Sequence, residues 1–145
     1  MVDPQLLAEQ AAAAMWADDA ASQAMGMAID EVRPGYARVS MAVRPDMVNG
    51  HGICHGGLVF ALADSAFAFA CNSHNRTTVA QACDIVYVTP ARLGDHLLAE
   101  AVERTRFGRN GVYDVTVRRK GEVMAEFRGR SREIPGNVVP TESDP

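Results

Sequence analysis

The chain has 145 residues, the size of one domain with a single hydrophobic core. Its net charge of -4 at pH 7 argues against a nucleic-acid partner, and its composition, 48% hydrophobic and 22% charged, is that of a globular protein. Near the N-terminus, Asp18 and Asp19 interrupt the apolar run that a signal peptide would need. We therefore expect a cytoplasmic protein in which Cys54, Cys71 and Cys83 stay reduced.

The first part of the chain predicts a helix, a hairpin and a loop. An alanine-rich segment behind Pro4 favours a helix that Gly26 would end. A proline-glycine turn then separates two short runs of strand composition, and a segment with proline, asparagine and glycines follows. The expected ranges are 4–24 for the helix, 28–33 and 36–43 for the strands, and 45–54 for the loop.

The segment from Gly56 to Asn72 is apolar almost all round, so its periodicity does not separate a helix from a buried strand. Its 17 residues are too many for a strand, which predicts a buried central helix. A membrane span is not expected, because Asp64 and Ser65 interrupt an apolar run that is shorter than the roughly 20 residues a bilayer needs.

Four strand candidates follow the helix, near residues 79–88, 97–106, 111–119 and 123–132. The separators are short and turn-like, which predicts an antiparallel meander. One apolar helix with about six antiparallel strands predicts an α+β domain whose curved sheet wraps around the helix. Such a sheet leaves a face and two edges exposed, so we expect dimers or larger assemblies. The domain organisation would be a helical arm over 1–26, the main domain over 27–134 and a flexible tail over 135–145.

An acid within the apolar helix needs an explanation. Asp64 lies about two turns into that helix, and a carboxylate is almost never fully buried unless it is paired. A structural hydrogen bond or a solvent-facing position would account for it. Gly56 and Gly57, however, place unpaired N–H groups and the positive end of the helix dipole at the helix start. That arrangement is typical of an oxyanion hole, although the glycines would also permit a tight turn.

The spacing of these residues constrains how they could cooperate. Gly57 and Asp64 are seven residues apart, which puts them on one helix face but separates them by roughly 10 Å. An acyl carbonyl needs its attacking group and its oxyanion donor each about 3 Å away. We therefore expect the glycine amide of one subunit to act with the aspartate of another.

The motifs around this helix resemble a known family. Asn49, "CHGGLVFALADSAFAFACNSHN", "VAQACDIVYVTPARLGDHLLAEA" and "GVYDVTV" are similar to the hotdog-fold acyl-CoA thioesterases of the PaaI type, over about residues 41–132. The resemblance implies a hotdog fold and hydrolysis of aryl-acyl thioesters of coenzyme A, such as hydroxyphenylacetyl-CoA, in phenylacetic acid degradation. It also implies homotetramers with active sites at dimer interfaces, no metal, and no cofactor beyond the coenzyme A of the substrate.

Site residues carry over by position. The resemblance makes Asp64 the nucleophile or the general base, and Gly56 or Gly57 the donor of a backbone N–H to the thioester oxygen. His55 and Asn49 would orient the thioester and water. The candidates for substrate binding are Ser65, Phe67 and Ala68 around the acyl group, and Arg106, Arg109 and Asn110 near the phosphates of coenzyme A.

Four other interpretations remain open. His51, Cys54 and His55 could ligate a metal, but no second Cys/His pair at zinc-like spacing follows, and Cys54 as a nucleophile lacks an orienting group. A hotdog dehydratase or hydratase would need a histidine soon after Asp64, and none comes before His74. A protein that binds acyl-CoA without turnover would have no chemical use for that acid.

Overall fold

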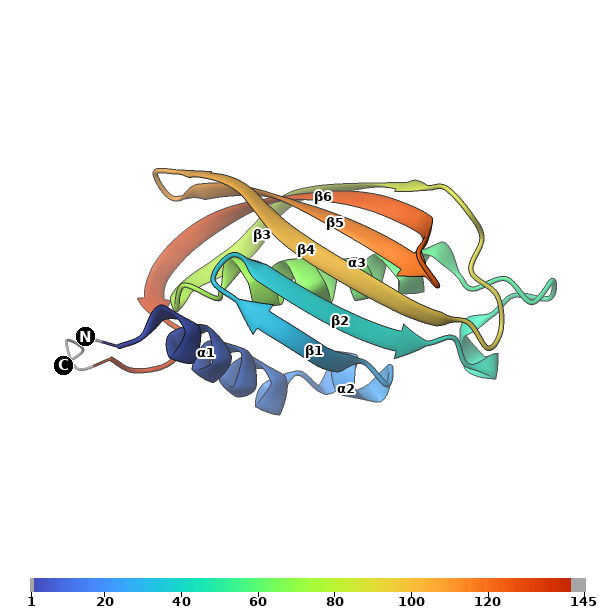
Figure 1. The fold of residues 1–145 in the computed structure, drawn as a ribbon, viewed down its shortest axis with the longest axis horizontal. Helices are drawn as coiled ribbons and strands as arrows, with labels where there is room; N and C mark the ends of the chain where they lie inside the picture. Colours follow the sequence, from blue (N-terminus) through green and yellow to red (C-terminus); the bar gives the residue numbers. More distant parts are fainter. Residues whose placement is uncertain (1, 142–145) are drawn as a thin grey trace.

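The computed structural model describes residues 2–141, and in it a six-stranded antiparallel sheet curves around one long helix (Figure 1). The strands run in the order β1-β2-β4-β5-β6-β3. This arrangement confirms the predicted α+β hotdog architecture. The helices are α1 (Pro4–Asp18), α2 (Ala20–Ala24) and α3 (Gly56–Cys71), with a 3₁₀ turn at Pro45–Met47; the strands are β1 (Ala28–Arg33), β2 (Tyr36–Ala42), β3 (Arg76–Tyr87), β4 (His96–Phe107), β5 (Asn110–Arg119) and β6 (Glu122–Asn137).

The predicted meander holds for β4, β5 and β6 but is wrong for β3, which pairs with β6 instead of β4. The reason lies in the segment between β3 and β4. It does not close a hairpin, because its backbone bonds to the loop before α3: Cys54 N donates to Ala91 O at 2.8 Å and Leu93 N to Gly52 O at 3.1 Å. β3 therefore becomes an edge strand of the sheet.

Two boundaries differ from the expected ones. The N-terminal helix breaks at Asp19, whose side chain accepts from Ser22 N at 3.0 Å and so starts a second helix. At the other end, β6 continues to Asn137, three residues into the segment expected to be a flexible tail. The Asn75 side chain then holds the backbone of Val139 through bonds of 2.7 and 2.9 Å. Residues 142–145 of that expected tail lie outside the described residues.

The core lies between the inner face of the sheet and α3. Leu62, Ala63 and Ala66 are completely buried there. Phe67 packs between Tyr113 and Phe127, with ring centroids 5.6 and 5.8 Å away. No helix of the described residues is long and apolar enough to cross a membrane. The helix that carries Asp64 is thus held on its inner side by apolar packing.

Gly129→Ala tests this packing, because a Cβ at Gly129 would stand 2.7 Å from two ring carbons of Phe67. Overpacking of this kind lowers the free energy of unfolding by about 1–3 kcal/mol. Urea unfolding monitored by circular dichroism measures the change. Gly50→Ala is the control, since nothing lies within 4 Å of a Cβ there. Equal midpoints for the two variants would contradict a tightly filled core at Phe67.

Candidate functional site

The loop before α3 is shaped by its own hydrogen bonds. His55 N donates to Met47 O at 2.9 Å, which fixes the entry to the helix. The Asn49 side-chain oxygen accepts from His51 N at 2.9 Å and from Ile53 N at 3.2 Å. The Asn49 side chain therefore stabilises the loop. Both Asn49 and His55 are exposed to solvent.

The start of α3 leaves two N–H groups free. Leu58 N and Val59 N both donate to His55 O, at 2.9 and 3.3 Å. The N–H groups of Gly56 and Gly57 make no hydrogen bond to an acceptor in residues 2–141. Gly57 is exposed, and nothing lies within 4 Å of a Cβ placed on it. A carbonyl oxygen can therefore approach these donors without displacing protein atoms.

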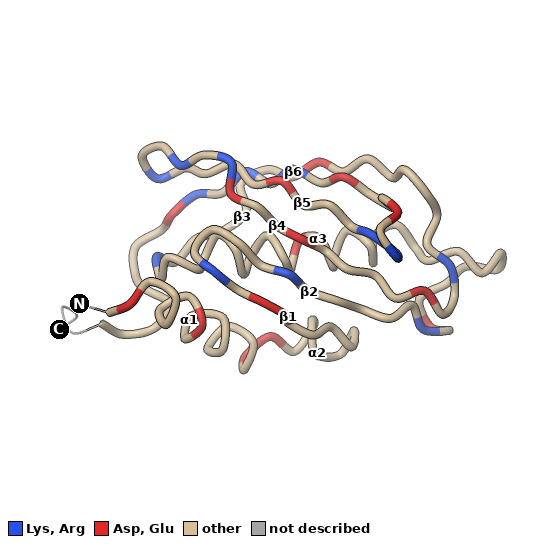
Figure 2. Tube along the Cα trace, in the orientation of Figure 1, with Lys and Arg blue, Asp and Glu red and all other residues tan. Residues whose placement is uncertain are grey.

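Asp64 is half-buried and is the single acid on α3, visible as the red segment of that helix in Figure 2. Its carboxylate makes no hydrogen bond or ion pair within the described part of the chain. Burial raises its pKa above the usual range for an aspartate. Burial raises the pKa of the Cys71 and Cys83 thiols, and the negative charge of Asp64 raises it further. Asp64 therefore lies near both thiols. Residues 2–141 thus offer no structural partner for this acid.

One helix does not bring the two catalytic candidates together. α3 is continuous from Gly56 to Cys71, so Gly57 and Asp64 are separated by roughly 10 Å along the helix axis, as expected from the sequence. An acyl carbonyl held by the N–H groups at the start of α3 therefore cannot also contact Asp64 of the same chain.

The residues expected around the acyl group lie in three different settings. Phe67 is 1% exposed and belongs to the hydrophobic core of the chain. The Ser65 hydroxyl is 2.9 Å from the hydroxyl of Ser22, which ties α3 to α2. Ala68 is half-buried, and its carbonyl accepts from the Asn72 side chain at 2.9 Å. Their contribution to an acyl pocket stays a prediction.

The arginines expected near the phosphates lie at the other end of the sheet. Arg109 lies in the turn between β4 and β5, and Arg106 and Asn110 lie beside it at the ends of those strands, where basic residues gather in Figure 2. Asn110 pairs with Arg132, whereas Tyr87, beside the start of α3, pairs with Ala125. These two positions on β6 are separated by seven residues, about 23 Å of strand. One subunit therefore does not bring the arginines to Gly57.

An apolar pocket lies beside Gly56, and no motif in the sequence predicted it. It has a volume of about 370 Å³, and its buried floor includes Val59 and Met124. Its lining comes from three stretches that are far apart in the chain, which is why no single motif indicated it. The exposed apolar run Val86-Tyr87-Val88 is the signal that could have done so. The lining residues are Ile53, Cys54, Gly56, Val59, Tyr87, Val88, Thr89, Pro90, Ala91 and Met124.

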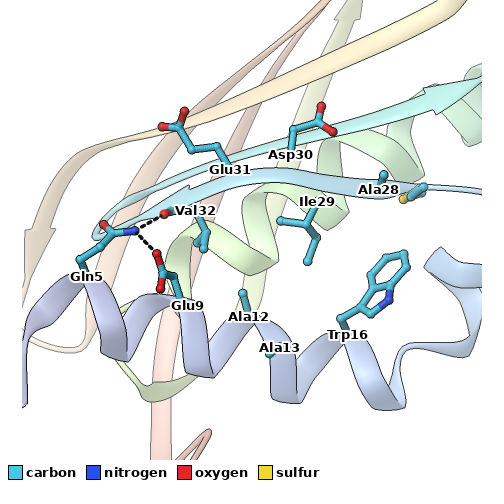
Figure 3. A pocket seen from close by; sticks show the side chains of 11 residues that line it. Gln5, Glu9, Ala12, Ala13, Trp16, Ala28, Ile29, Asp30, Glu31 and Val32 are labelled. Atoms are coloured by element: carbon cyan, nitrogen blue, oxygen red, sulfur yellow. Dashed lines mark hydrogen bonds between the residues drawn. The ribbon is translucent and has the colours of Figure 1, made fainter.

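A larger groove, about 600 Å³, lies between α1 and β1 (Figure 3). Gln5 bridges it, donating to Val32 O at 2.8 Å and to Glu9 at 3.0 Å. Its rim is acidic, and it contains none of the predicted site residues. The groove is therefore separate from the start of α3 and from Asp64.

The metal interpretation gains no support from the geometry. Within residues 2–141, no three His, Cys, Asp or Glu side chains come together as a possible metal site. Cys54 is buried, and burial raises the pKa of its thiol, which disfavours the thiolate that a nucleophile or ligand requires.

Gly57→Val is expected to leave the fold intact but to cover the free N–H groups. The position is open and has no positive φ, so the midpoint of thermal unfolding should change little. Loss of oxyanion donors typically lowers kcat by about 100-fold or more. Release of free thiol from thioesters, the substrates that the resemblance implies, measures this effect, with Gly50→Val as the control. Full activity in Gly57→Val would remove the helix start from the site.

Comparison with known proteins places this geometry in context. The profile of the thioesterase superfamily matches residues 51–126. The acyl-coenzyme A thioesterase PaaI of Escherichia coli is 44% identical over 131 residues, covering 90% of this chain and 94% of that protein. A putative esterase of Archaeoglobus fulgidus is 33% identical and covers 88% and 83% of the two chains. The solved structure of Escherichia coli PaaI, from the phenylacetic acid degradation operon, matches with a TM-score of 0.91 at 42% identity, over 93% of this chain and 99% of that one.

Proposed function

The chain belongs to the thioesterase superfamily, and from this premise we propose that it hydrolyses acyl-CoA thioesters, with aryl-acyl groups such as phenylacetyl as its substrates. The resemblance to the PaaI type is confirmed by the identity and by the fold. One observation supports the proposed site most directly: α3 carries a carboxylate and two N–H groups for which residues 2–141 provide no hydrogen-bond partner.

The two parts of the site come from different subunits. The N–H groups of Gly56 and Gly57 in one subunit hold the thioester oxygen and stabilise the negative charge that develops on it. Asp64 of the other subunit, once ionised, attacks the carbonyl carbon or takes a proton from the attacking water. Either route consumes one water and yields the free acid and the thiol of coenzyme A. His55 and Asn49 would act beside the N–H groups of their own subunit.

The free edge of β3 supports such a dimer. It exposes Val79 and Val86, and Tyr87 and Val88 continue the apolar surface, although long apolar edges normally pair or are covered. Antiparallel pairing of two β3 strands would run the two copies of α3 in opposite directions. The start of one helix then approaches the middle of the other, where Asp64 lies.

The same pairing would bring the β4–β5 turn of the second subunit to the end of the sheet where α3 of the first begins. Arg106, Arg109 and Asn110, in or beside that turn, could then reach the phosphates of coenzyme A. Arg106 forms an ion pair with Glu103 at 3.4 Å. Arg109 forms no ion pair with any described residue, so its charge is available to a phosphate. We propose a homotetramer of such dimers, working in the cytoplasm without a cofactor.

Release of coenzyme A thiol from a panel of aryl-acyl and straight-chain acyl-CoA thioesters tests the proposed function. We expect turnover, with phenylacetyl-type substrates preferred. Binding of acyl-CoA by calorimetry without release of thiol would instead indicate a binding protein. Release from straight-chain substrates alone would overturn the proposed acyl preference while keeping the reaction.

A further inference from the structure

We propose that Tyr87 is a positioning residue for the oxyanion-binding start of α3, an inference that rests on the proposed thioesterase function. Tyr87 ends β3, whereas Gly56 begins α3, so the contact joins two elements far apart in the sequence. The Tyr87 hydroxyl donates to Gly56 O at 2.8 Å. This hydrogen bond reaches the helix start from outside the helix.

The tyrosine ring also packs directly on the glycine. A Cβ at Gly56 would stand 2.9 Å from Cζ, 3.0 Å from the hydroxyl oxygen and 3.3 Å from Cε1 of Tyr87. A side chain at Gly56 would therefore displace the tyrosine ring, whereas glycine lets the ring rest on the helix start. Gly57, by contrast, has open space at the same point and faces solvent.

The hydrogen bond acts on the peptide unit that supplies a donor. The carbonyl of Gly56 and the N–H of Gly57 belong to one planar amide. A hydrogen bond accepted by that oxygen polarises the amide and strengthens its N–H as a donor. Because the ring and hydroxyl together fix the position of Gly56, its own N–H is oriented as well. Tyr87 can therefore affect the oxyanion hole whichever glycine binds the thioester oxygen.

The contact further connects the helix start to the dimer edge. Tyr87 lies on β3, the strand whose free edge would pair with the second subunit, and is 51% exposed in one subunit. Tyr87 thus fixes the N–H groups of Gly56 and Gly57 relative to β3. In the proposed dimer, the pairing of β3 in turn determines the position of the partner's Asp64. The position of the oxyanion-binding N–H groups relative to the partner subunit therefore depends on the contact between Tyr87 and Gly56.

Tyr87→Phe is the test, because it keeps the ring on Gly56 and removes only the hydroxyl. Loss of a direct oxyanion donor lowers kcat by 10²–10³, so loss of a supporting bond is expected to lower kcat by about tenfold, with KM within about twofold. Tyr36→Phe is the matched control, because the Tyr36 hydroxyl donates to Glu100 at 2.6 Å between β2 and β4, in the half of the sheet away from β3. We expect Tyr36→Phe to retain wild-type kcat.

A spectroscopic readout separates positioning from mere support of the fold. A ketone analogue, in which a methylene group separates the carbonyl from the sulfur of coenzyme A, binds without being hydrolysed. Its carbonyl stretch, measured by isotope-edited infrared spectroscopy, should lie at a lower frequency in the wild type than in Tyr87→Phe. Gly56→Ala displaces the ring and should also lower kcat, and adding Tyr87→Phe to it should cause little further loss.

The outcomes distinguish the positioning role from the thioesterase function itself. If the wild type releases thiol and Tyr87→Phe matches it in both kcat and carbonyl frequency, the positioning role is wrong and the thioesterase function stands. If the wild type releases no thiol from any substrate, the proposed function fails first. A Tyr87→Phe variant with raised KM, unchanged kcat and an unshifted carbonyl would assign Tyr87 to substrate binding and overturn the inference.

Discussion

Asp64→Asn is expected to lower kcat by about 10³-fold while the protein remains folded and oligomeric, since general-base and nucleophilic roles both need the carboxylate. The amide keeps the size of the side chain but neither accepts a proton nor attacks a carbonyl. No hydrogen bond or ion pair within residues 2–141 is broken by the change. Thiol release under saturating phenylacetyl-CoA measures kcat, and size-exclusion chromatography checks the assembly.

The control for this prediction is Asp84→Asn, on β3. Asp84 is largely exposed and lies 3.5 Å from Arg130. Surface ion pairs of this kind contribute little, so activity and stability should both stay near wild type. Wild-type activity in Asp64→Asn would show that the acid has no chemical role, and the subunit-sharing mechanism would have to be abandoned.

The pH dependence of Asp64 has a definite sign. Burial raises its pKa, so the folded protein holds this proton more tightly than the unfolded chain does. The contribution of this group to stability is therefore highest in acid. It falls as the pH rises from the ordinary aspartate pKa, about 3.9, toward the raised folded value, and is constant above it.

Two consequences follow for measurement. Asp64→Asn should be at least as stable as the wild type at neutral pH, and the difference should vanish in acid, as urea unfolding at several pH values would show. In the wild type, kcat should rise with pH as Asp64 ionises, at a pH above the ordinary aspartate range. A kcat that is flat from pH 4 upward would contradict a raised pKa in the assembled enzyme.

Mixing two inactive variants is expected to restore activity. Asp64→Asn lacks the carboxylate, and Gly57→Val covers the N–H groups, so each homodimer is inactive at both of its sites. A mixed dimer has one site with both defects and one site with neither. Random reassortment makes half of the dimers mixed, so about a quarter of wild-type activity should return.

The experiment requires exchange of subunits, by dilute denaturant followed by refolding or by coexpression with two tags. The control is a protein carrying both substitutions in one chain and mixed with the wild type. In a dimer of one wild-type and one doubly substituted chain, one site lacks the carboxylate and the other has covered N–H groups. Both sites are therefore inactive, and the mixed dimers contribute no activity. If the two single variants regain nothing on mixing, the catalytic groups come from one subunit and the distance along α3 does not separate them.

Several elements could be predicted because their signals are local. The apolar length of the segment from Gly56 to Asn72 indicated the central helix, and the short, turn-like separators after it indicated the order β4-β5-β6. The distance between Gly57 and Asp64 follows from helix rise alone, so the expectation of a shared site needed no tertiary structure. The motif around these residues also sufficed to indicate the family.

Other features depend on contacts between segments far apart in the chain. The place of β3 at the edge was decided by hydrogen bonds from the 88–95 segment to the loop before α3, which no turn signal reveals. The absence of a partner for Asp64, within the part of the chain that the structure describes, emerges only once every neighbouring side chain is in place. The separation of Arg109 from Gly57 likewise follows from strand register.

Sequence by itself thus determined the helix, the acid on it, the free donors at its start and their spacing, because each depends on the periodicity and chemistry of one short segment. Tertiary structure alone decided that β3 is a free edge, that Phe67 lies in the core, and that Tyr87 rests on Gly56. These depend on which strands pair and on which atoms then compete for the same volume, and pairing across long loops leaves no local pattern in the chain.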